Sequence, residues 1–127
     1  MIQDKSAVLY IGSDRINLAL LQLLFRKKLS DLTLLETDDT FKGIEIAHTH
    51  KLALIMVDIQ FPVANNYDIL SILKSCPDTA AIPIWAISAC AFNEEIAKGI
   101  QAGFNRYITK PIDLKTFIQR IRMDIAI

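Results

Sequence analysis

Short apolar runs alternate along this chain with longer stretches in which apolar residues recur every three or four positions. The short runs predict five strands, at residues 7–11, 32–37, 52–57, 82–87 and 106–109. The longer stretches predict five helices, at residues 14–29, 40–50, through Leu70 and Leu73 to near Pro77, at 93–102 with Gly103 as the C-cap, and from Leu114 to Ile125. The order is therefore strand then helix, repeated five times.

The strand at residues 52–57 is apolar at every position, which is typical of a strand covered on both faces. Strands of this kind, each followed by a helix, predict a parallel sheet with helices on both sides, a doubly wound α/β fold. The 127 residues fit one domain spanning 1–127, and 52% apolar content is enough for its core.

Composition excludes several classes of function. Fourteen basic residues balance fourteen acidic ones, so no basic excess is present to bind nucleic acid. No apolar stretch approaches the ~20 residues that span a membrane, and the N-terminus lacks a secretory signal pattern. Cys76 and Cys90 have no metal-ligand spacing, so we expect reduced thiols in a cytoplasmic protein.

Three polar residues end predicted strands of the sheet. Asp58 follows the third strand, Ser88 the fourth and Lys110 the fifth. Ligands of doubly wound sheets bind at the carboxyl ends of the strands, so these side chains are expected to converge there. A carboxylate that takes a phosphoryl group and a lysine that neutralises its oxygens suit phosphoryl chemistry. The ordinary alternative for each residue alone is a turn aspartate or a solvated lysine.

Four segments resemble the receiver domains of bacterial response regulators, in the order that this family has them. They are residues 8–11 with Asn17 and Leu18, residues 58–62 followed by 66–70, residues 84–89, and Gly99 with 102–104 and 107–113. The first segment is similar to receivers found in hybrid histidine kinases. The resemblance covers nearly the whole chain.

This resemblance implies a flavodoxin-like sheet with strand order 2-1-3-4-5 and a signalling domain rather than an enzyme. It implies Asp58 as the phosphoryl acceptor, Lys110 as the phosphoryl-binding cation, and Ser88 and Tyr107 as the switch pair. It also implies a cis bond between Lys110 and Pro111. The implied partner is a histidine kinase or a histidine phosphotransfer domain, and a homodimer is a further candidate.

The chain departs from the family at its metal site. Receivers carry two adjacent acidic residues after the first strand, which hold Mg²⁺, and here those positions are Gly12 and Ser13. Mg²⁺ prefers hard oxygen ligands, and the remaining candidates are Asp58, the backbone carbonyl of Gln60 and, weakly, Asp14. Asp14 is alternatively the N-cap of the first helix. We therefore expect weak binding of Mg²⁺.

Without the acidic pair, Lys110 is expected to form a direct ion pair with Asp58, with Ser88 or a water in the metal position. Two functions stay open on this basis. One is a receiver phosphorylated at Asp58, weakly or atypically dependent on Mg²⁺. The alternative is a phosphorylation-independent pseudo-receiver that acts as a protein interaction module. A flavodoxin-like enzyme or nucleotide binder is disfavoured, because no glycine-rich loop follows the first strand.

Apolar residues of the predicted first helix fall on two opposite arcs. One arc holds Leu18, Leu21 and Phe25, and the other holds Ile16, Leu20 and Leu23. A helix that covers one face of a sheet needs a single apolar face. The second arc is therefore either an unusually apolar surface or a docking surface for a second copy or a helical partner.

Overall fold

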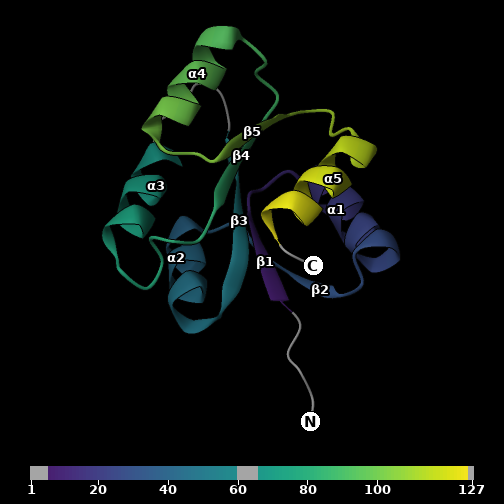
Figure 1. Ribbon diagram of the computed structural model, residues 1–127, viewed down its shortest axis with the longest axis horizontal. Coiled ribbons are helices and arrows are strands. Elements are labelled where there is room, and N and C mark those ends of the chain that lie inside the picture. The colour runs from purple at the N-terminus through teal and green to yellow at the C-terminus, as the bar shows by residue number, and fades with distance from the viewer. Residues whose placement is uncertain (1–5, 60–65, 126–127) are drawn as a thin grey trace.

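The computed structural model describes residues 6–59 and 66–125, which form a parallel sheet with helices on both faces (Figure 1). The elements in chain order are β1 (Ser6–Ile11), α1 (Arg15–Lys28), β2 (Leu32–Thr37), α2 (Thr40–Thr49), β3 (Leu52–Ile59), α3 (Asn66–Ser75), β4 (Ile84–Ser88), α4 (Asn93–Ala102), β5 (Arg106–Thr109) and α5 (Leu114–Asp124). The strand order is β2-β1-β3-β4-β5. The predicted fold class and strand order are confirmed.

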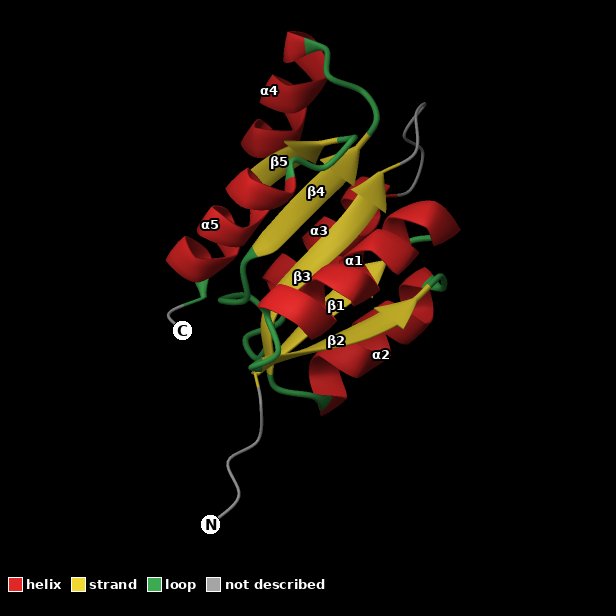
Figure 2. Cartoon of the chain, turned by 90° about the vertical axis from the view of Figure 1, so that its right-hand side faces the viewer, coloured by secondary structure: helices red, strands yellow, loops and turns green. Residues whose placement is uncertain are grey.

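Two layers of helices enclose two apolar cores. Helices α1 and α5 cover one face of the sheet, and α2, α3 and α4 cover the other (Figures 1 and 2). Side chains alternate between the faces, so Tyr10, Met56 and Trp85 belong to the core under α1 and α5. Leu9 and Ile55, each one position away, belong to the opposite core. All strands run in the same direction (Figure 2), so their carboxyl ends meet at one edge.

The third and fourth strands end later than the sequence predicted, at Ile59 and Ser88 rather than at residues 57 and 87, and the fourth also begins later, at Ile84 rather than at residue 82. Asp58 pairs with Ile87 and Ile59 pairs with Ser88, so both polar residues lie inside the ladder rather than after it. The ends of these strands were predicted from the positions of their last apolar residues. Strand pairing uses backbone groups, however, and continues beneath a polar side chain.

Several local expectations are met. The Lys110–Pro111 bond is cis, and Gly103, with a φ of 126°, caps α4 in the conformation that favours glycine. Cys76 and Cys90 are both free thiols. None of the helices in the described part of the chain has the length and apolar character needed to traverse a bilayer.

The first helix only partly follows the predicted arcs. Leu21 and Phe25 are buried as expected, and Ile16 and Leu23 are 85% and 42% exposed. The prediction is wrong for Leu20, which is partly buried against the core, because α1 also packs over β2 and so buries a wider arc. The outward apolar surface is reduced to Ile16 and Leu23, and its role in docking or dimerisation stays a prediction.

Truncations on the two sides of α1 should therefore differ in their effect on stability. Leu21→Ala removes a fully buried side chain and should lower the free energy of unfolding by about 2–5 kcal/mol. Leu23→Ala, the matched control on the exposed side, should change it by less than about 0.5 kcal/mol. Urea denaturation followed by circular dichroism measures both. Equal losses for the two variants would contradict this assignment of the buried side.

Candidate functional site

Asp58 lies near the end of the central strand β3, with its side chain only 3% exposed. The Nζ atom of Lys110 lies 2.8 Å from its Oδ2 and 3.0 Å from its Oδ1. Lys110 follows β5, and its backbone N–H donates to the carbonyl of Ser88 at 2.8 Å, which fixes where the side chain starts. The ion pair predicted between Asp58 and Lys110 is present.

The same ammonium group also binds Asp14, whose Oδ2 lies 2.7 Å from Nζ. Hydrogen bonding to Lys110, helped by the backbone N–H of Asn17, holds the pKa of Asp14 below its usual range. Burial by itself would lower the pKa of Lys110. Its hydrogen bonds to Asp14 and Asp58 outweigh that effect and raise it. Lys110 is therefore a cation at neutral pH, shared between two carboxylates.

Asp14 performs two structural tasks at once. Its Oδ1 accepts from the backbone N–H of Asn17 at 3.0 Å, so the N-cap interpretation is confirmed. Its Oδ2 is the oxygen bound to Lys110. Both oxygens of this carboxylate are thus hydrogen-bonded within the protein.

Tyr10 reaches Asp58 from inside the sheet, and the sequence did not identify it as a site residue. Its hydroxyl donates to Oδ2 of Asp58 at 2.5 Å, and the side-chain amide of Asn17 donates to that hydroxyl at 3.3 Å. Tyr10 is fully buried. Burial, followed by the hydrogen bond to Asp58, raises its pKa far above the usual range, so it is a neutral donor.

Strand register explains this contact. Tyr10 pairs with Met56, and Asp58 lies two residues further along β3, on the same face. A tyrosine is long enough to extend past its own register position to the strand end. The sequence feature that could have identified Tyr10 is a tyrosine in a largely aliphatic strand, two residues before a glycine.

Gly12 leaves the space that this hydroxyl occupies. A Cβ atom at position 12 would lie 2.6 Å from the Cβ of Asp58 and 2.9 Å from the hydroxyl oxygen of Tyr10. Both distances are shorter than side chains tolerate, so the close approach of Tyr10 and Asp58 requires glycine here.

The two carboxylates predicted as metal ligands, those of Asp58 and Asp14, accept hydrogen bonds from protein donors. Gly12 and Ser13 offer no carboxylate, and the carboxylates of Asp58 and Asp14 are held by Lys110, Tyr10 and a backbone N–H. Within residues 6–59 and 66–125, no group of three or more His, Cys, Asp or Glu residues could hold a metal ion. Gln60, the predicted backbone ligand, lies outside the described residues. The donor set present suits an ammonium ion better than Mg²⁺.

The predicted switch residues meet at the backbone of Cys90. The hydroxyl of Ser88, a buried residue, accepts from the Cys90 N–H at 3.0 Å. The hydroxyl of Tyr107 donates to the Cys90 carbonyl at 3.1 Å. The hydroxyl that binds Asp58 is that of Tyr10, and the expectation of Ser88 or a water in the metal position stays a prediction.

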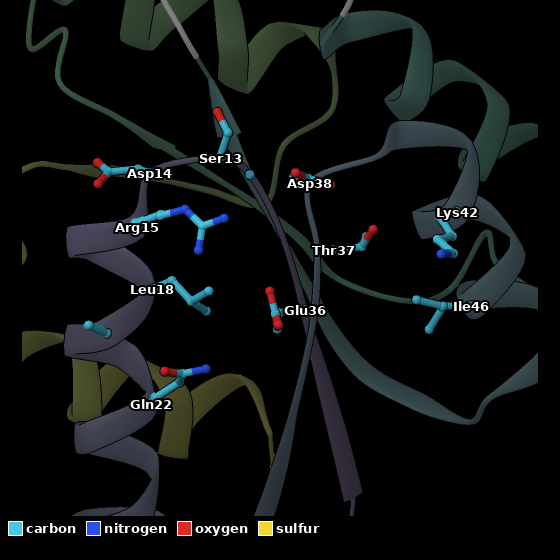
Figure 3. Close-up of a pocket in the computed structure, with 12 residues that line it drawn as sticks. Ser13, Asp14, Arg15, Leu18, Gln22, Glu36, Thr37, Asp38, Lys42 and Ile46 are labelled. Carbon is cyan, nitrogen blue, oxygen red and sulfur yellow. The ribbon is translucent and has the colours of Figure 1, made fainter.

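Of the hollows lined by described residues, two concern this edge of the sheet. One contains the predicted site and is lined by Asp14, Asp58, Ile59, Ser88, Ala89, Cys90 and Lys110. The other lies between α1 and α2 beside β2 (Figure 3). Arg15 points into that second hollow, whereas the carboxylate of Asp14 points away from it. Asp14 lines both hollows, and its carboxylate binds Lys110 in the first.

The chain is similar to known proteins over most of its length. The family model of the response regulator receiver domain matches residues 8–122. The polar-differentiation response regulator DivK of Brucella anthropi is 27% identical over 116 residues, which cover 91% of this chain and 93% of DivK.

Solved structures of receiver domains share the fold. The receiver domain of the sensor histidine kinase PA1611 from Pseudomonas aeruginosa, with a magnesium ion coordinated in its active-site cleft, has a TM-score of 0.82 at 18% identity and covers 98% of this chain and 100% of that one. The receiver domain of Ssk1 from Saccharomyces cerevisiae, crystallised with the histidine phosphotransfer protein Ypd1, has a TM-score of 0.79 at 22% identity and covers 99% and 92%. Binding of a divalent metal is thus found among receivers of this fold.

Removal of the shared ammonium group should lower stability in a pH-dependent way. Lys110→Met leaves the buried charge of Asp58 with Tyr10 as its remaining donor, and should cost about 2–3 kcal/mol at pH 7. The pKa of Asp14 is lower in the folded protein than in the unfolded chain. The stabilisation that Asp14 contributes through its ion pair with Lys110 is therefore complete above its unfolded pKa of about 4, and it is lost as the pH falls through the lower folded pKa. The raised pKa of Lys110 means that the pair persists to at least about pH 10.

Urea denaturation of the unaltered protein and the Lys110→Met variant at pH 7 and at about pH 2.5 measures the difference. Lys115→Met, which changes an exposed lysine on α5, is the control and should have little effect at either pH. A difference that does not shrink in acid would show that the ion pairs of Lys110 contribute nothing to stability.

The space at Gly12 can be tested with a double-mutant cycle. Gly12→Ala should cost about 1–3 kcal/mol, because the new methyl group overlaps Asp58 and the Tyr10 hydroxyl. In a Tyr10→Phe background one of the two overlaps is gone, so the cost should fall by about 1 kcal/mol. Denaturation curves of the four proteins give the coupling, and strictly additive costs would contradict the proposed contact.

Proposed function

The chain belongs to the response regulator receiver domain family, and we propose that Asp58 is its phosphoryl acceptor in phosphorelay signalling. The observation that carries this proposal is the contact between the Asp58 carboxylate and the Lys110 ammonium, 2.8 Å apart in a hollow at the carboxyl edge of the sheet. The proposed role is that of a signalling domain rather than an enzyme. We also propose a cytoplasmic location, where the free thiols of Cys76 and Cys90 stay reduced.

The donor proposed is a phosphohistidine of a histidine kinase or of a histidine phosphotransfer protein. A carboxylate oxygen of Asp58 attacks the phosphorus, a P–O bond forms, and the P–N bond to the imidazole breaks. The departing imidazole nitrogen keeps the electron pair of that bond and takes a proton from solvent. Lys110 already contacts both oxygens of the acceptor, so its ammonium can neutralise charge on the transferred group. The complex of Ypd1 with the Ssk1 receiver supports a partner of this kind.

The proposed readout passes through Cys90. Ser88 lies beside Asp58 in the same hollow, so its hydroxyl is placed to bind an oxygen of the phosphoryl group. To do so it gives up the hydrogen bond from the N–H of Cys90. The carbonyl of Cys90 is bound by Tyr107, so a shift of this segment reaches Tyr107 and the adjoining helix α4.

A pseudo-receiver is the second candidate, and one specific observation favours it. Both oxygens of Asp58 already have hydrogen-bond donors, and Lys110 is shared with Asp14. A phosphoryl group has to compete with Asp14 for the lysine. In this alternative the domain binds its partner without phosphorylation.

A phosphotransfer experiment tests the proposal. A histidine phosphotransfer protein carrying a radiolabelled phosphoryl group, or phosphoramidate, is incubated with the domain, and the label is located by mass spectrometry of its peptides. We expect one phosphoryl group on Asp58, none on Asp58→Asn, and normal labelling of Asp68→Asn, which changes an exposed aspartate on α3. Equal labelling of Asp58→Asn would exclude Asp58 as the acceptor. Partner binding with no label on the unaltered domain would favour the pseudo-receiver.

A further inference from the structure

We infer that the Tyr10 hydroxyl and the Lys110 ammonium together replace the divalent metal at this receiver site, which is therefore metal-independent. The inference concerns the same residues as the proposed function. Its test measures metal binding, however, so it stands or fails separately from phosphorylation. Four features of the site support it.

The first feature is the charge balance. The site contains two carboxylates, those of Asp14 and Asp58, and one ammonium group, that of Lys110, which gives a formal charge of −1. Two further acidic residues at positions 12 and 13 would bring this to −3, a charge that a divalent cation offsets. With Gly12 and Ser13 in those positions, a single lysine offsets half of the negative charge. The electrostatic demand for Mg²⁺ is therefore much reduced.

The second feature is that the carboxylate oxygens are occupied. Oδ2 of Asp58 accepts from Tyr10 and Lys110, and Oδ1 accepts from Lys110. The oxygens of Asp14 accept from Asn17 and from Lys110. Mg²⁺ requires near-octahedral oxygen ligands and gives up its water reluctantly, so it would have to displace several of these donors at once.

The third feature is that Tyr10 cannot easily give way or become a ligand. Its side chain is fully buried in the core under α1 and α5. The amide of Asn17 donates to the hydroxyl oxygen, which directs the hydroxyl proton toward Asp58. A phenol oxygen used in this way presents a proton, not a lone pair, to the space beside Asp58.

The fourth feature links the missing acid to the added hydroxyl. A side chain at position 12 would overlap the Tyr10 hydroxyl, as the 2.9 Å separation of a Cβ atom from that oxygen shows. An acidic residue at position 12 and a Tyr10 hydroxyl bound to Asp58 are therefore incompatible. The absence of an acid at position 12 is thus the condition for the hydrogen bond between Tyr10 and Asp58. The two differences from a metal-binding receiver site occur together for this reason.

The consequence is that the acceptor is held in place without metal. Tyr10 and Asn17 are positioning residues in this scheme, because they act on phosphoryl chemistry through Asp58. The orientation of Asp58, and any phosphorylation of it, should be the same in Mg²⁺ and in a chelator.

Metal titration of a set of variants tests the inference. The proteins are the unaltered domain, Tyr10→Phe, Ser13→Asp and the double variant Tyr10→Phe/Ser13→Asp, with Tyr67→Phe/Ser13→Asp as the matched control. Tyr67 lies on α3, packs against Phe104 and belongs to the core on the face of the sheet opposite Tyr10. Mg²⁺ binding is measured by calorimetry, and Mn²⁺ is located by the broadening of backbone amide NMR signals. Circular dichroism checks that each variant is folded.

We expect the unaltered domain and Tyr10→Phe to show no saturable Mg²⁺ binding in the millimolar range. The double variant should bind Mg²⁺ at least about 10-fold more tightly than Ser13→Asp alone, and Mn²⁺ should broaden the signals of residues 12–14 and 58. The Tyr67→Phe control should bind no more tightly than Ser13→Asp. Submillimolar binding by the unaltered domain would overturn the inference. Equal affinity of Ser13→Asp and the double variant would do the same.

Phosphorylation outcomes are interpreted separately. Label on Asp58 that persists in a chelator supports both the proposed function and the inference. Label that requires Mg²⁺ supports the function and overturns the inference. If no label appears, the function fails, and the titration alone decides the inference.

Discussion

The carboxylate of Asp58 is buried, and the arrangement of the carboxyl edge depends on how that charge is stabilised. A buried carboxylate is costly unless it is paired and hydrogen-bonded. Lys110 supplies the opposite charge from the end of β5, and Tyr10 supplies a neutral donor from β1. Asp14 then binds the other side of the same ammonium group, which links the start of α1 to the site.

The groups that stabilise the Asp58 carboxylate come from β1, from the residue after β5 and from the start of α1. Their arrangement also depends on Gly12, which has no side chain. Gly12 lets Tyr10 and Asp58 approach each other, and the first turn of α1 contributes Asn17, whose side-chain amide donates to the hydroxyl of Tyr10. In the PA1611 receiver a magnesium ion is coordinated in the active-site cleft, whereas here a phenol and an ammonium group bind the carboxylate of Asp58. The proposed phosphoryl acceptor, Asp58, is therefore held by side chains of the protein itself.

The alternation of apolar runs with helical periods was enough to predict the fold. Strands buried on both faces require helices on both faces, and right-handed crossovers leave few arrangements of such units. The convergence of Asp58, Ser88 and Lys110 also followed, because the carboxyl ends of parallel strands share one edge. Strand ends were less accurate, since backbone pairing continues past the last apolar residue.

The sequence by itself determined the sheet, the edge of the sheet at which the polar residues gather, and the absence of acids at Gly12 and Ser13. Only the tertiary structure decided what takes the place of those acids. The register of β1 on β3 puts Tyr10 two positions before Asp58 on the same face, and a side chain that looks like core in the sequence reaches the site. Such a contact depends on the reach and direction of one side chain between strands 48 positions apart. The local sequence pattern does not predict how close the Tyr10 hydroxyl lies to the Asp58 carboxylate, because that distance is set by packing between segments that are remote in the chain.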